Sequence, residues 1–298
     1  MIQQREPHTL HSMYDTLTLH NGLPIPCMGF GTYKTTLDGT SRILKTAIAE
    51  GHRYFDTASF YGNEPQVGEA IADSGLPRED FFIASKVWRT EMGYEKTLEA
   101  FEGSLHRLGT DYLDLYLMHW PRPDLVDPKW RELAAETWRA MEDLYLAGRV
   151  WAIGVCNFLP HHLEPLLERC RIVPMVDQIE FHPGYPNLAT VNYCQERDIM
   201  VQAWWPFCRG RIFGDDLIQK LCAKYGATPA QICLRYAIQK GVIPLPKSST
   251  PQRMRENQNV FFFHISSEDM YRLDSLPQIG WSGEHPDREK VPQVVPQV

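Results

Sequence analysis

Residues 51–64 read GHRYFDTASFYGNE, and this stretch decides how the rest of the chain is interpreted. The apolar run Arg53-Tyr54-Phe55 ends on Asp56, and Tyr61 follows five residues later. Short apolar runs bounded by polar and turn-forming residues are typical of buried β-strands. The stretch therefore predicts a strand that carries a carboxylate at its end and a tyrosine in the loop that follows.

The same alternation of strand and helix recurs along the chain. Strands are expected near residues 28–31, 53–56, 81–85, 112–118, 150–154, 175–178, 200–204 and 242–243. Helical stretches fall near 40–50, 64–74, 94–108, 130–147, 163–170, 188–197, 215–225 with 229–240, 251–257 and 268–276. Thr250-Pro251 is a good helix start, because threonine caps the helix and proline fits its first position.

Eight strands that alternate with helices predict an α/β fold, the (β/α)₈ TIM barrel. A doubly wound open sheet is the alternative. Its nucleotide-binding form would need G-x-G-x-x-G after the first strand, but Gly29-Phe30-Gly31 is followed by Thr32-Tyr33-Lys34. Alternating residues around Asn21-Gly22 predict an N-terminal β-hairpin that covers one end of the barrel.

The 298 residues are expected to form a single barrel domain, 1–298, with loose tails at 1–14 and 290–298. The last tail repeats a Val-Pro-Gln-Val unit. Before it, residues 278–286 hold Trp281 and His285 in a loop, which suggests a C-terminal flap rather than an inert tail.

Composition bounds the function. With 30 basic and 37 acidic residues the net charge is −7, which favours neither nucleic acid nor an anionic membrane as a partner. The seven cysteines are scattered without a C-x-x-C spacing, which favours free thiols in a reducing compartment. With neither a secretory signal nor a membrane-length apolar run in view, a cytoplasmic location is expected.

Polar residues end three consecutive strands of the predicted barrel. Asp56 and Lys86 follow strands two and three, and His119 follows strand four. Barrel enzymes carry their chemistry at this end, and adjacent strands lie about 4.8 Å apart, so these side chains and Tyr61 can converge. Tyrosine is a poor acid, with a pKa near 10, but an ammonium beside it stabilises the phenolate. Lys86 is therefore expected to lower the pKa of Tyr61.

This set of residues suits reduction of a carbonyl. Tyr61 would donate the proton, Asp56 would hold Lys86, and His119 would contact the substrate oxygen, so that the reaction needs a hydride donor. Each of these residues taken alone is more often structural. Their joint occurrence in this order is much harder to explain by chance.

The segments that carry these residues resemble signatures of the aldo-keto reductase family. Residues 51–64, 113–121, 243–248 and 253–257 match four such signatures, and the resemblance runs from about residue 16 to 275. It implies a (β/α)₈ barrel that binds NADPH, usually without a metal. It also implies that Tyr61 is the general acid and that Asp56, Lys86 and His119 complete a catalytic tetrad.

The end of the chain is expected to hold the cofactor's phosphates. Lys247, Ser248 and Arg253 open a helix, an arrangement that suits the extra 2′-phosphate of NADPH over NADH. By the resemblance, Glu256 and Asn257 contact the adenine. A solvated basic turn is the alternative.

The nicotinamide end follows from the resemblance as well. The matching positions are Thr32, Cys156, Asn157, Gln178, Trp204 and Phe207. Cys156 stands where the family usually has serine, Trp204 where it has tyrosine, and Asp177 where asparagine is common. Trp205 replaces a small serine, and Phe207 an aliphatic residue. Residues 203–207 are therefore expected to alter the cofactor clamp or reshape the pocket.

Aromatic residues are expected to line the substrate pocket. Tyr33, Trp88 and Trp120 match pocket-wall positions, His119 contacts the substrate, and Trp281 is expected to come from the flap. Such walls favour apolar or flat carbonyl compounds. The short loops are similar to the branch that includes diketogluconate reductases and prostaglandin F synthase-like enzymes, whose barrels are expected to be monomers or weak oligomers.

Two other functions stay open. A non-catalytic NADPH-binding sensor on the same fold would explain the unusual Trp204-Trp205 pair. A metal-dependent aldolase or isomerase would use His119, Glu180 and His182 as ligands.

Overall fold

The computed structural model describes residues 10–289. Eight parallel strands form one sheet in the order β10-β9-β8-β7-β6-β5-β4-β3. They are β3 (Phe30–Gly31), β4 (Tyr54–Asp56), β5 (Phe82–Val87), β6 (Leu115–Met118), β7 (Ile153–Cys156), β8 (Val176–Glu180), β9 (Met200–Trp204) and β10 (Val242–Pro244). The predicted (β/α)₈ fold is confirmed.

Backbone hydrogen bonds join the first and last strands of the sheet. The amide of Gly29 donates to the carbonyl of Pro244 at 3.1 Å, and the amide of Gly31 donates to Pro246 at 3.0 Å. Glycine is required for this approach, because a Cβ on Gly29 would lie 2.5 Å from a methyl of Leu245. The barrel is therefore closed by a contact that only a residue without a side chain permits.

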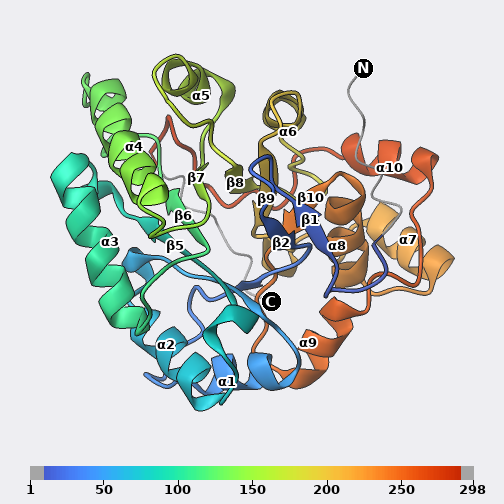
Figure 1. Ribbon diagram of the computed structural model, residues 1–298. Coiled ribbons are helices and arrows are strands. Elements are labelled where there is room, and N and C mark those ends of the chain that lie inside the picture. The colour runs from blue at the N-terminus through green and yellow to red at the C-terminus, as the bar shows by residue number, and fades with distance from the viewer. Residues whose placement is uncertain (1–9, 290–298) are drawn as a thin grey trace.

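Helices surround the sheet on its outer side (Figure 1). The ring consists of α1 (Arg42–Ala49), α2 (Glu64–Asp73), α3 (Tyr94–Leu108), α4 (Trp130–Leu146), α5 (Pro160–Leu167), α6 (Leu188–Gln195), α8 (Pro229–Gln239) and α9 (Pro251–Gln258). Two further helices, α7 (Asp216–Tyr225) and α10 (Ser267–Asp274), lie beside α8 at the edge of the molecule. None of the described helices is long and apolar enough to cross a membrane.

The helix pattern follows the sequence closely. In α3 the buried positions include Thr97, Phe101 and Leu108, spaced so that one stripe faces the sheet, and Gly109 ends the helix in a left-handed conformation. Helix α8 begins with the capping pair Thr228 and Gln231. Helix α9 begins at Thr250-Pro251, as predicted.

Some predicted boundaries were wrong. Helix α5 begins at Pro160 rather than residue 163, because the His162 ring accepts the backbone N–H of Leu159 and caps the helix start. Strand β5 runs on to Val87, so Lys86 lies inside the strand, opposite Leu117 of β6, and not after its end. Its side chain therefore comes from a rigid ladder position.

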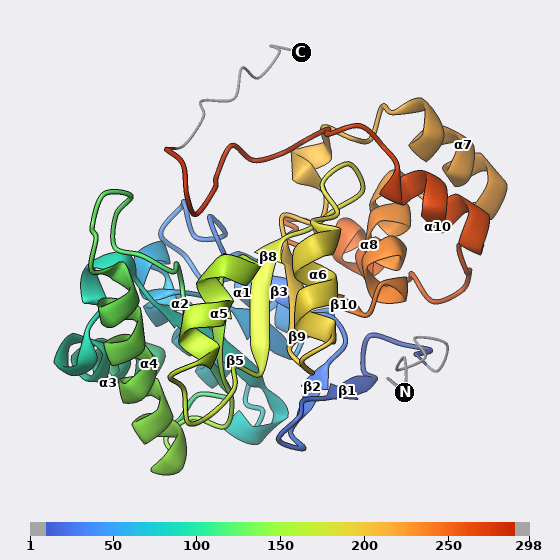
Figure 2. The same ribbon diagram turned by 90° about the horizontal axis from the view of Figure 1, so that it is seen from above.

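The two ends of the barrel are closed differently. The hairpin of β1 (Thr16–Thr18) and β2 (Pro24–Pro26) pairs antiparallel and lies at one end, as predicted. The strap, defined here as residues 279–289, lies at the other (Figure 2). The expected loose tails at 1–9 and 290–298 lie outside the described residues. In contrast to that expectation, Leu10 and Met13 are buried, and Leu10 packs against Leu234 and Val260.

Candidate active site

A pocket of about 660 Å³ opens at the carboxyl ends of the strands, under the strap. Its wall includes Asp56, Tyr61 and His119 together with residues that come from the loops after six other strands or from the strap. Lys86 is fully buried beneath it. The structure thus brings the four predicted tetrad residues to one place.

Asp56 and Lys86 form a buried ion pair under the pocket. Lys86 Nζ lies 2.7 Å from Asp56 Oδ1 and donates a second hydrogen bond to the Thr57 carbonyl at 2.9 Å. The other carboxylate oxygen, Oδ2, accepts from Gln178 Nε2 at 2.8 Å. Burial opposes the charge of Lys86, but Asp56, together with Tyr61 and Cys156, outweighs this, so the pKa of Lys86 is raised and the ammonium is kept.

A chain of hydrogen bonds extends this pair across the barrel. Gln178 Nε2 also lies 3.0 Å from Gln202 Oε1, and Gln202 Nε2 donates to the Tyr54 hydroxyl at 2.8 Å. Every member comes from a strand, namely β4, β8 or β9. Buried networks of this kind hold their members in one geometry when each polar group is satisfied.

Tyr61 lies between the ion pair and the pocket. It ends the 3-10 turn Ser59–Tyr61 after β4, and Lys86 Nζ lies 5.2 Å from the centre of its ring. Burial raises the pKa of Tyr61, and Lys86 opposes this without overcoming it. The expectation of a lowered pKa was therefore wrong, because the sequence shows the ammonium but not the burial. The phenol keeps its proton at neutral pH and can donate it.

His119 faces Tyr61 across the pocket. The two ring centres lie 5.7 Å apart at an angle of 76°, and Trp88 contacts His119 from another side at 5.0 Å. Burial, with Lys86 and Arg89, lowers the pKa of His119 well below its usual value, so the imidazole is neutral. His119 lines the pocket, and its Nδ1 is buried without a hydrogen-bond partner in the described residues.

The residues expected at the nicotinamide end line the same pocket. Thr32, Cys156, Gln178, Trp204 and Phe207 all belong to its wall. Asn157 has a left-handed backbone, with φ at 63°, which aims its amide at the pocket. Asn157 Oδ1 accepts a hydrogen bond from Trp204 Nε1 at 2.9 Å. The indole that stands in the place of tyrosine is therefore a hydrogen-bond donor, which a phenylalanine ring would not be.

The segment that follows β9 has an unusual backbone. Trp205, Cys208 and Arg209 have φ of 60°, 41° and 55°, values that bulky residues rarely adopt. The Arg209 guanidinium lies 4.3 Å from the centre of the Trp205 ring, which covers it. Strained backbone of this kind gathers at binding sites, and here it shapes the pocket rim.

The predicted phosphate site is divided. Lys247 lines the pocket, and burial together with Arg209 and Lys34 lowers its pKa. Ser248, Arg253, Glu256 and Asn257 lie on or next to α9, outside the pocket wall. Glu256 accepts a hydrogen bond from Thr228 at 2.7 Å, and Arg253 is exposed. Lys34, Arg209 and Lys247 line the pocket together, which suits an anionic ligand.

Aromatic side chains form the other wall. Tyr33 lies 4.9 Å from the Tyr61 ring, and Phe60 stacks on Trp88 at 3.8 Å. Trp120 lines the pocket as predicted, but Trp281 is not part of the wall. Its indole lies against Tyr185 and donates to the carbonyl of Glu284. The prediction for Trp281 was wrong because the strap turns between these two residues.

Several pocket residues were missed from sequence, among them Phe60, Arg89 and Glu284. Phe60 and Arg89 adjoin the predicted residues Tyr61 and Trp88, and that adjacency to a strand end was the available signal. Glu284 lies on the strap, and no local pattern places it over the barrel. It enters the wall only because the strap returns across the mouth.

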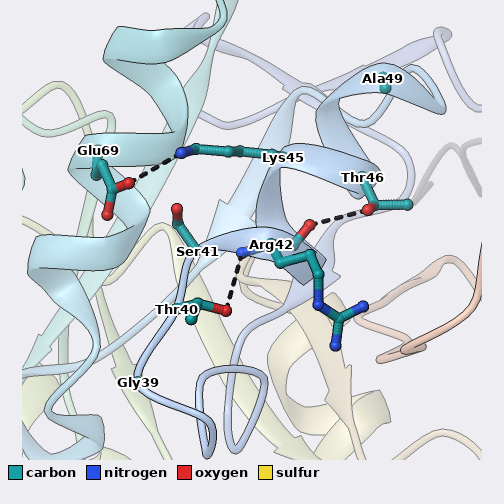
Figure 3. A pocket seen from close by; sticks show the side chains of 8 residues that line it. All are labelled: Gly39, Thr40, Ser41, Arg42, Lys45, Thr46, Ala49 and Glu69. Atoms are coloured by element: carbon teal, nitrogen blue, oxygen red, sulfur yellow. Dashed lines mark hydrogen bonds and ion pairs between the residues drawn. The ribbon is translucent and has the colours of Figure 1, made fainter.

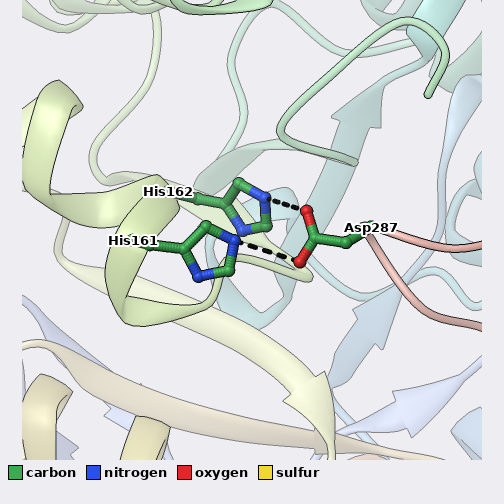
Figure 4. Close-up of side chains that lie close together, drawn as sticks. All are labelled: His161, His162 and Asp287. Atoms are coloured by element: carbon green, nitrogen blue, oxygen red, sulfur yellow. Dashed lines mark hydrogen bonds and ion pairs between the residues drawn. The ribbon is translucent and has the colours of Figure 1, made fainter. Parts of the chain in front are cut away.

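Two carboxylates attach the strap, in addition to hydrogen bonds from the Ile279 amide to the Gly184 carbonyl at 3.1 Å and from Arg211 to the Trp281 carbonyl at 3.0 Å. Glu180 accepts from the backbone and hydroxyl of Ser282, and also bonds His182 at 3.2 Å. Asp287 bonds His161, His162 and Arg122 at 3.0, 2.9 and 2.7 Å (Figure 4). The strap is therefore held over the pocket by two carboxylates.

Of the three metal ligands of the alternative function, Glu180 and His182 lie together, but His119 does not join them. Within residues 10–289 the one cluster of three metal-ligand side chains is His161, His162 and Asp287, not His119, Glu180 and His182. His162 Nδ1 accepts the Leu159 N–H, so its Nε2 carries the proton that bonds Asp287. Arg122 holds the same carboxylate, and the cluster is thus a clasp for the strap.

A second hollow lies at the start of α1, with a volume of about 600 Å³ (Figure 3). It is open to solvent, and its one lysine, Lys45, bonds Glu69 at 2.8 Å and Asp73 at 2.7 Å. No nucleophile or acid–base pair gathers there among the described residues. The chemistry therefore identifies the barrel mouth, and not this hollow, as the candidate active site.

Comparison with known proteins agrees with this choice. The family model named "Aldo/keto reductase family" matches residues 27–278. The glyoxal reductase of Bacillus subtilis is 43% identical over 277 residues, covering 93% of this chain and 98% of that protein. The 9,11-endoperoxide prostaglandin H2 reductase of Trypanosoma cruzi is 39% identical, covering 92% and 95%.

Solved structures give the same result. An aldo/keto reductase from Brucella melitensis has a TM-score of 0.82 at 39% identity and covers 88% of this chain and 98% of that one. An aldo-keto reductase of the silkworm, Bombyx mori, complexed with NADPH has a TM-score of 0.84 at 33% identity and covers 96% and 95%.

Proposed function

The chain belongs to the aldo/keto reductase family, and on that premise we propose that it reduces an aldehyde or ketone to an alcohol with NADPH. The observation that supports this most strongly is the pairing of Lys86 with Asp56 directly beneath Tyr61. A relative with a known reductase activity and a structural neighbour that binds NADPH support the same assignment.

Tyr61 is the proton donor in this proposal. Its phenol retains the proton at neutral pH, because burial raises its pKa. When a carbonyl becomes an alkoxide, the oxygen becomes far more basic than a phenolate, so the transfer from Tyr61 is downhill. The Lys86 ammonium then stabilises the phenolate that remains, and Asp56 keeps that ammonium charged and in place.

His119 positions the carbonyl. A neutral imidazole on the pocket wall can hydrogen-bond the substrate oxygen without competing for the proton. The aromatic wall of Tyr33, Trp88 and Trp120 excludes water around it. This arrangement orients the reacting carbon and leaves proton transfer to Tyr61.

The residues at the rim fit NADPH. Bound NADPH supplies the hydride, and the Asn157 and Gln178 amides would hold its carboxamide. The cations Lys34, Arg209 and Lys247 would neutralise its phosphates, and Lys247 favours NADPH over NADH. Ser248, Arg253, Glu256 and Asn257, on the outer side of the same edge, would hold the 2′-phosphate and adenine.

A fluorescence titration with NADPH tests this proposal, followed in the same cuvette by oxidation with a panel of aldehydes and ketones. Binding with turnover is expected. Binding of NADPH without turnover of any compound in the panel would identify a cofactor sensor. The observation that favours this second function is the hydrogen bond between Trp204 and Asn157. Absence of NADPH binding would overturn both functions.

The replacement Lys247→Met tests the cofactor assignment. We expect it to weaken NADPH about 10-fold or more and to leave NADH almost unchanged, since a charged hydrogen bond contributes about 1.5–3 kcal/mol. Lys220→Met on α7 is the matched control, because this lysine is exposed outside the pocket wall. Equal losses for both cofactors would place Lys247 at the pyrophosphate that they share and would contradict a contact to the 2′-phosphate.

A further inference from the structure

One cation of the substrate wall has no partner of its own. Arg89 begins the 3-10 turn Arg89–Glu91 after β5, and it lines the pocket. Its guanidinium lies 4.2 Å from the centre of the Trp120 ring and 5.6 Å from that of Trp88. Its Nε is buried and meets no hydrogen-bond acceptor in the described residues. A stacked but unpaired guanidinium is thereby held in a fixed place.

The acids near Arg89 do not neutralise it by contact. Glu91, two residues on, is turned to other donors, with Oε2 at 2.6 Å from Ser59 Oγ and 2.7 Å from the Trp88 amide. Glu284 reaches the same pocket from the strap, and its charge raises the pKa of Arg89, but burial has the larger effect and lowers it. Among the ion pairs of residues 10–289, none includes Arg89.

The charge of Arg89 acts where the reaction takes place. It contributes to the lowered pKa of His119, which contacts Trp88 at 5.0 Å, the residue next to Arg89 in the chain. A guanidinium offers donors in a fixed fork that matches a carboxylate. A ligand with an anionic group can pair with the guanidinium where it lines the pocket, while its carbonyl lies beside His119 and Tyr61.

We propose that Arg89 binds a carboxylate on the substrate, so that the preferred substrates are aldehydes or ketones that carry a carboxylate. This inference rests on the proposed reductase function and narrows its substrate class. Trp120 holds the guanidinium, and Glu284 at the mouth weakens the binding of an anion and so sets how strongly the pocket prefers it.

A matched pair of substrates tests the inference. 4-Carboxybenzaldehyde and benzaldehyde share a ring and an aldehyde and differ in one carboxylate. For the wild type, kcat/KM is expected to be higher with 4-carboxybenzaldehyde. Arg89→Met is expected to lower that value about 10- to 100-fold, mainly through KM, and to leave benzaldehyde within about 3-fold. Arg89→Lys keeps the charge and should recover part of the loss.

Arg169→Met is the control for removing a positive charge, because this arginine is exposed after α5 and outside the pocket. It should change neither substrate. Glu284→Gln should raise kcat/KM for 4-carboxybenzaldehyde several-fold relative to that for benzaldehyde. NADPH titration of each variant shows whether the barrel and its cofactor site are intact.

Two results would overturn the inference while the reductase stands. One is wild-type turnover of both aldehydes with no preference for the carboxylate. The other is an Arg89→Met variant that binds NADPH normally and loses both substrates equally, which would make Arg89 a wall residue. A wild type that binds NADPH and reduces neither aldehyde nor any other carbonyl would instead remove the proposed function, and this inference with it.

Discussion

The barrel mouth and the layer between β8 and α6 each bury one aspartate, and they treat its charge in opposite ways. Asp56 divides its two carboxylate oxygens between Lys86 and Gln178. Asp177 meets the Cys194 thiol at 3.6 Å through one oxygen, and its other oxygen has no partner in the described residues. Burial raises the pKa of Asp177 well above its usual value.

The difference shows how the contacts of a buried carboxylate decide whether its charge is stabilised. A buried carboxylate remains charged when an ammonium and an amide compensate for lost hydration, and otherwise it takes up a proton. The adjacent β8 residues Asp177 and Gln178 point to opposite sides of the sheet, so one strand serves both environments. The carboxylate at the mouth is therefore compensated by an ion pair, whereas burial favours the protonated form of the acid in the outer layer.

The largest effect is expected from removing the proton donor of the mouth. Tyr61→Phe should lower kcat about 10²- to 10⁴-fold, because the ring remains and the general acid is lost. NADPH binding, measured by fluorescence, should stay within about 2-fold of wild type. Tyr94→Phe on α3 is the matched control, since its hydroxyl bonds Asp143 away from the pocket. Full activity in Tyr61→Phe would contradict the assignment.

Removing Lys86 makes Asp56 resemble Asp177. Lys86→Met should lower the free energy of unfolding at pH 7 by about 3–5 kcal/mol, since it leaves a buried carboxylate uncompensated. Urea unfolding at pH 7 measures it.

Lys45→Met is the control for this change. Lys45 pairs with Glu69 and Asp73 at the surface, where such pairs contribute about 0–1 kcal/mol. A loss for Lys86→Met as small as that of the control would mean that the ion pair of the mouth does not support the fold.

The converse change removes the lone acid. The pKa of Asp177 is raised in the folded state, so as pH rises the unfolded chain loses this proton at a lower pH than the folded protein. The free energy of unfolding therefore falls as pH rises above the pKa of the unfolded chain, near 3.8. Asp177→Asn should abolish that fall, which has a slope of about 1.4 kcal/mol per pH unit until the folded group ionises. Urea unfolding measured from pH 4 to 8 should show the free energy of unfolding of the variant rising relative to that of the wild type.

Asp143→Asn should show the opposite sign. A hydrogen bond from Arg171 lowers the pKa of Asp143, so this group stabilises the fold above its unfolded pKa and loses that effect as pH falls. Because the pair is exposed, the expected loss at neutral pH is below about 1 kcal/mol. Parallel pH profiles for the two variants would contradict the distinction between paired and unpaired carboxylates.

The smallest effect concerns a neutral contact of the mouth. Trp204→Phe keeps an aromatic ring but removes the donor to Asn157, and a neutral hydrogen bond contributes about 1 kcal/mol. NADPH should bind roughly 5-fold more weakly. Trp151→Phe is the control, because this exposed indole stacks on Tyr112 away from the pocket. Unchanged or tighter binding would show that Trp204 does not position Asn157.

Much of the fold and of the catalytic centre was predictable from the sequence. Eight apolar runs alternate with helical stretches, and this periodicity is local, so it predicted the barrel and most of its boundaries. Strand ends of a parallel barrel meet at one mouth, and the order of Asp56, Lys86 and His119 therefore predicted their convergence.

Tertiary structure alone decided the properties that depend on distant neighbours. Burial, which no local pattern reveals, raised the pKa of Tyr61 against the effect of Lys86. The return of the strap across the mouth brought Glu284 into the pocket and turned Trp281 away from it. The sequence by itself determines which groups can react, because the reactive groups are set by the residue types. Charge state and selectivity depend on desolvation and on contacts between remote segments, and these exist only once the chain is folded.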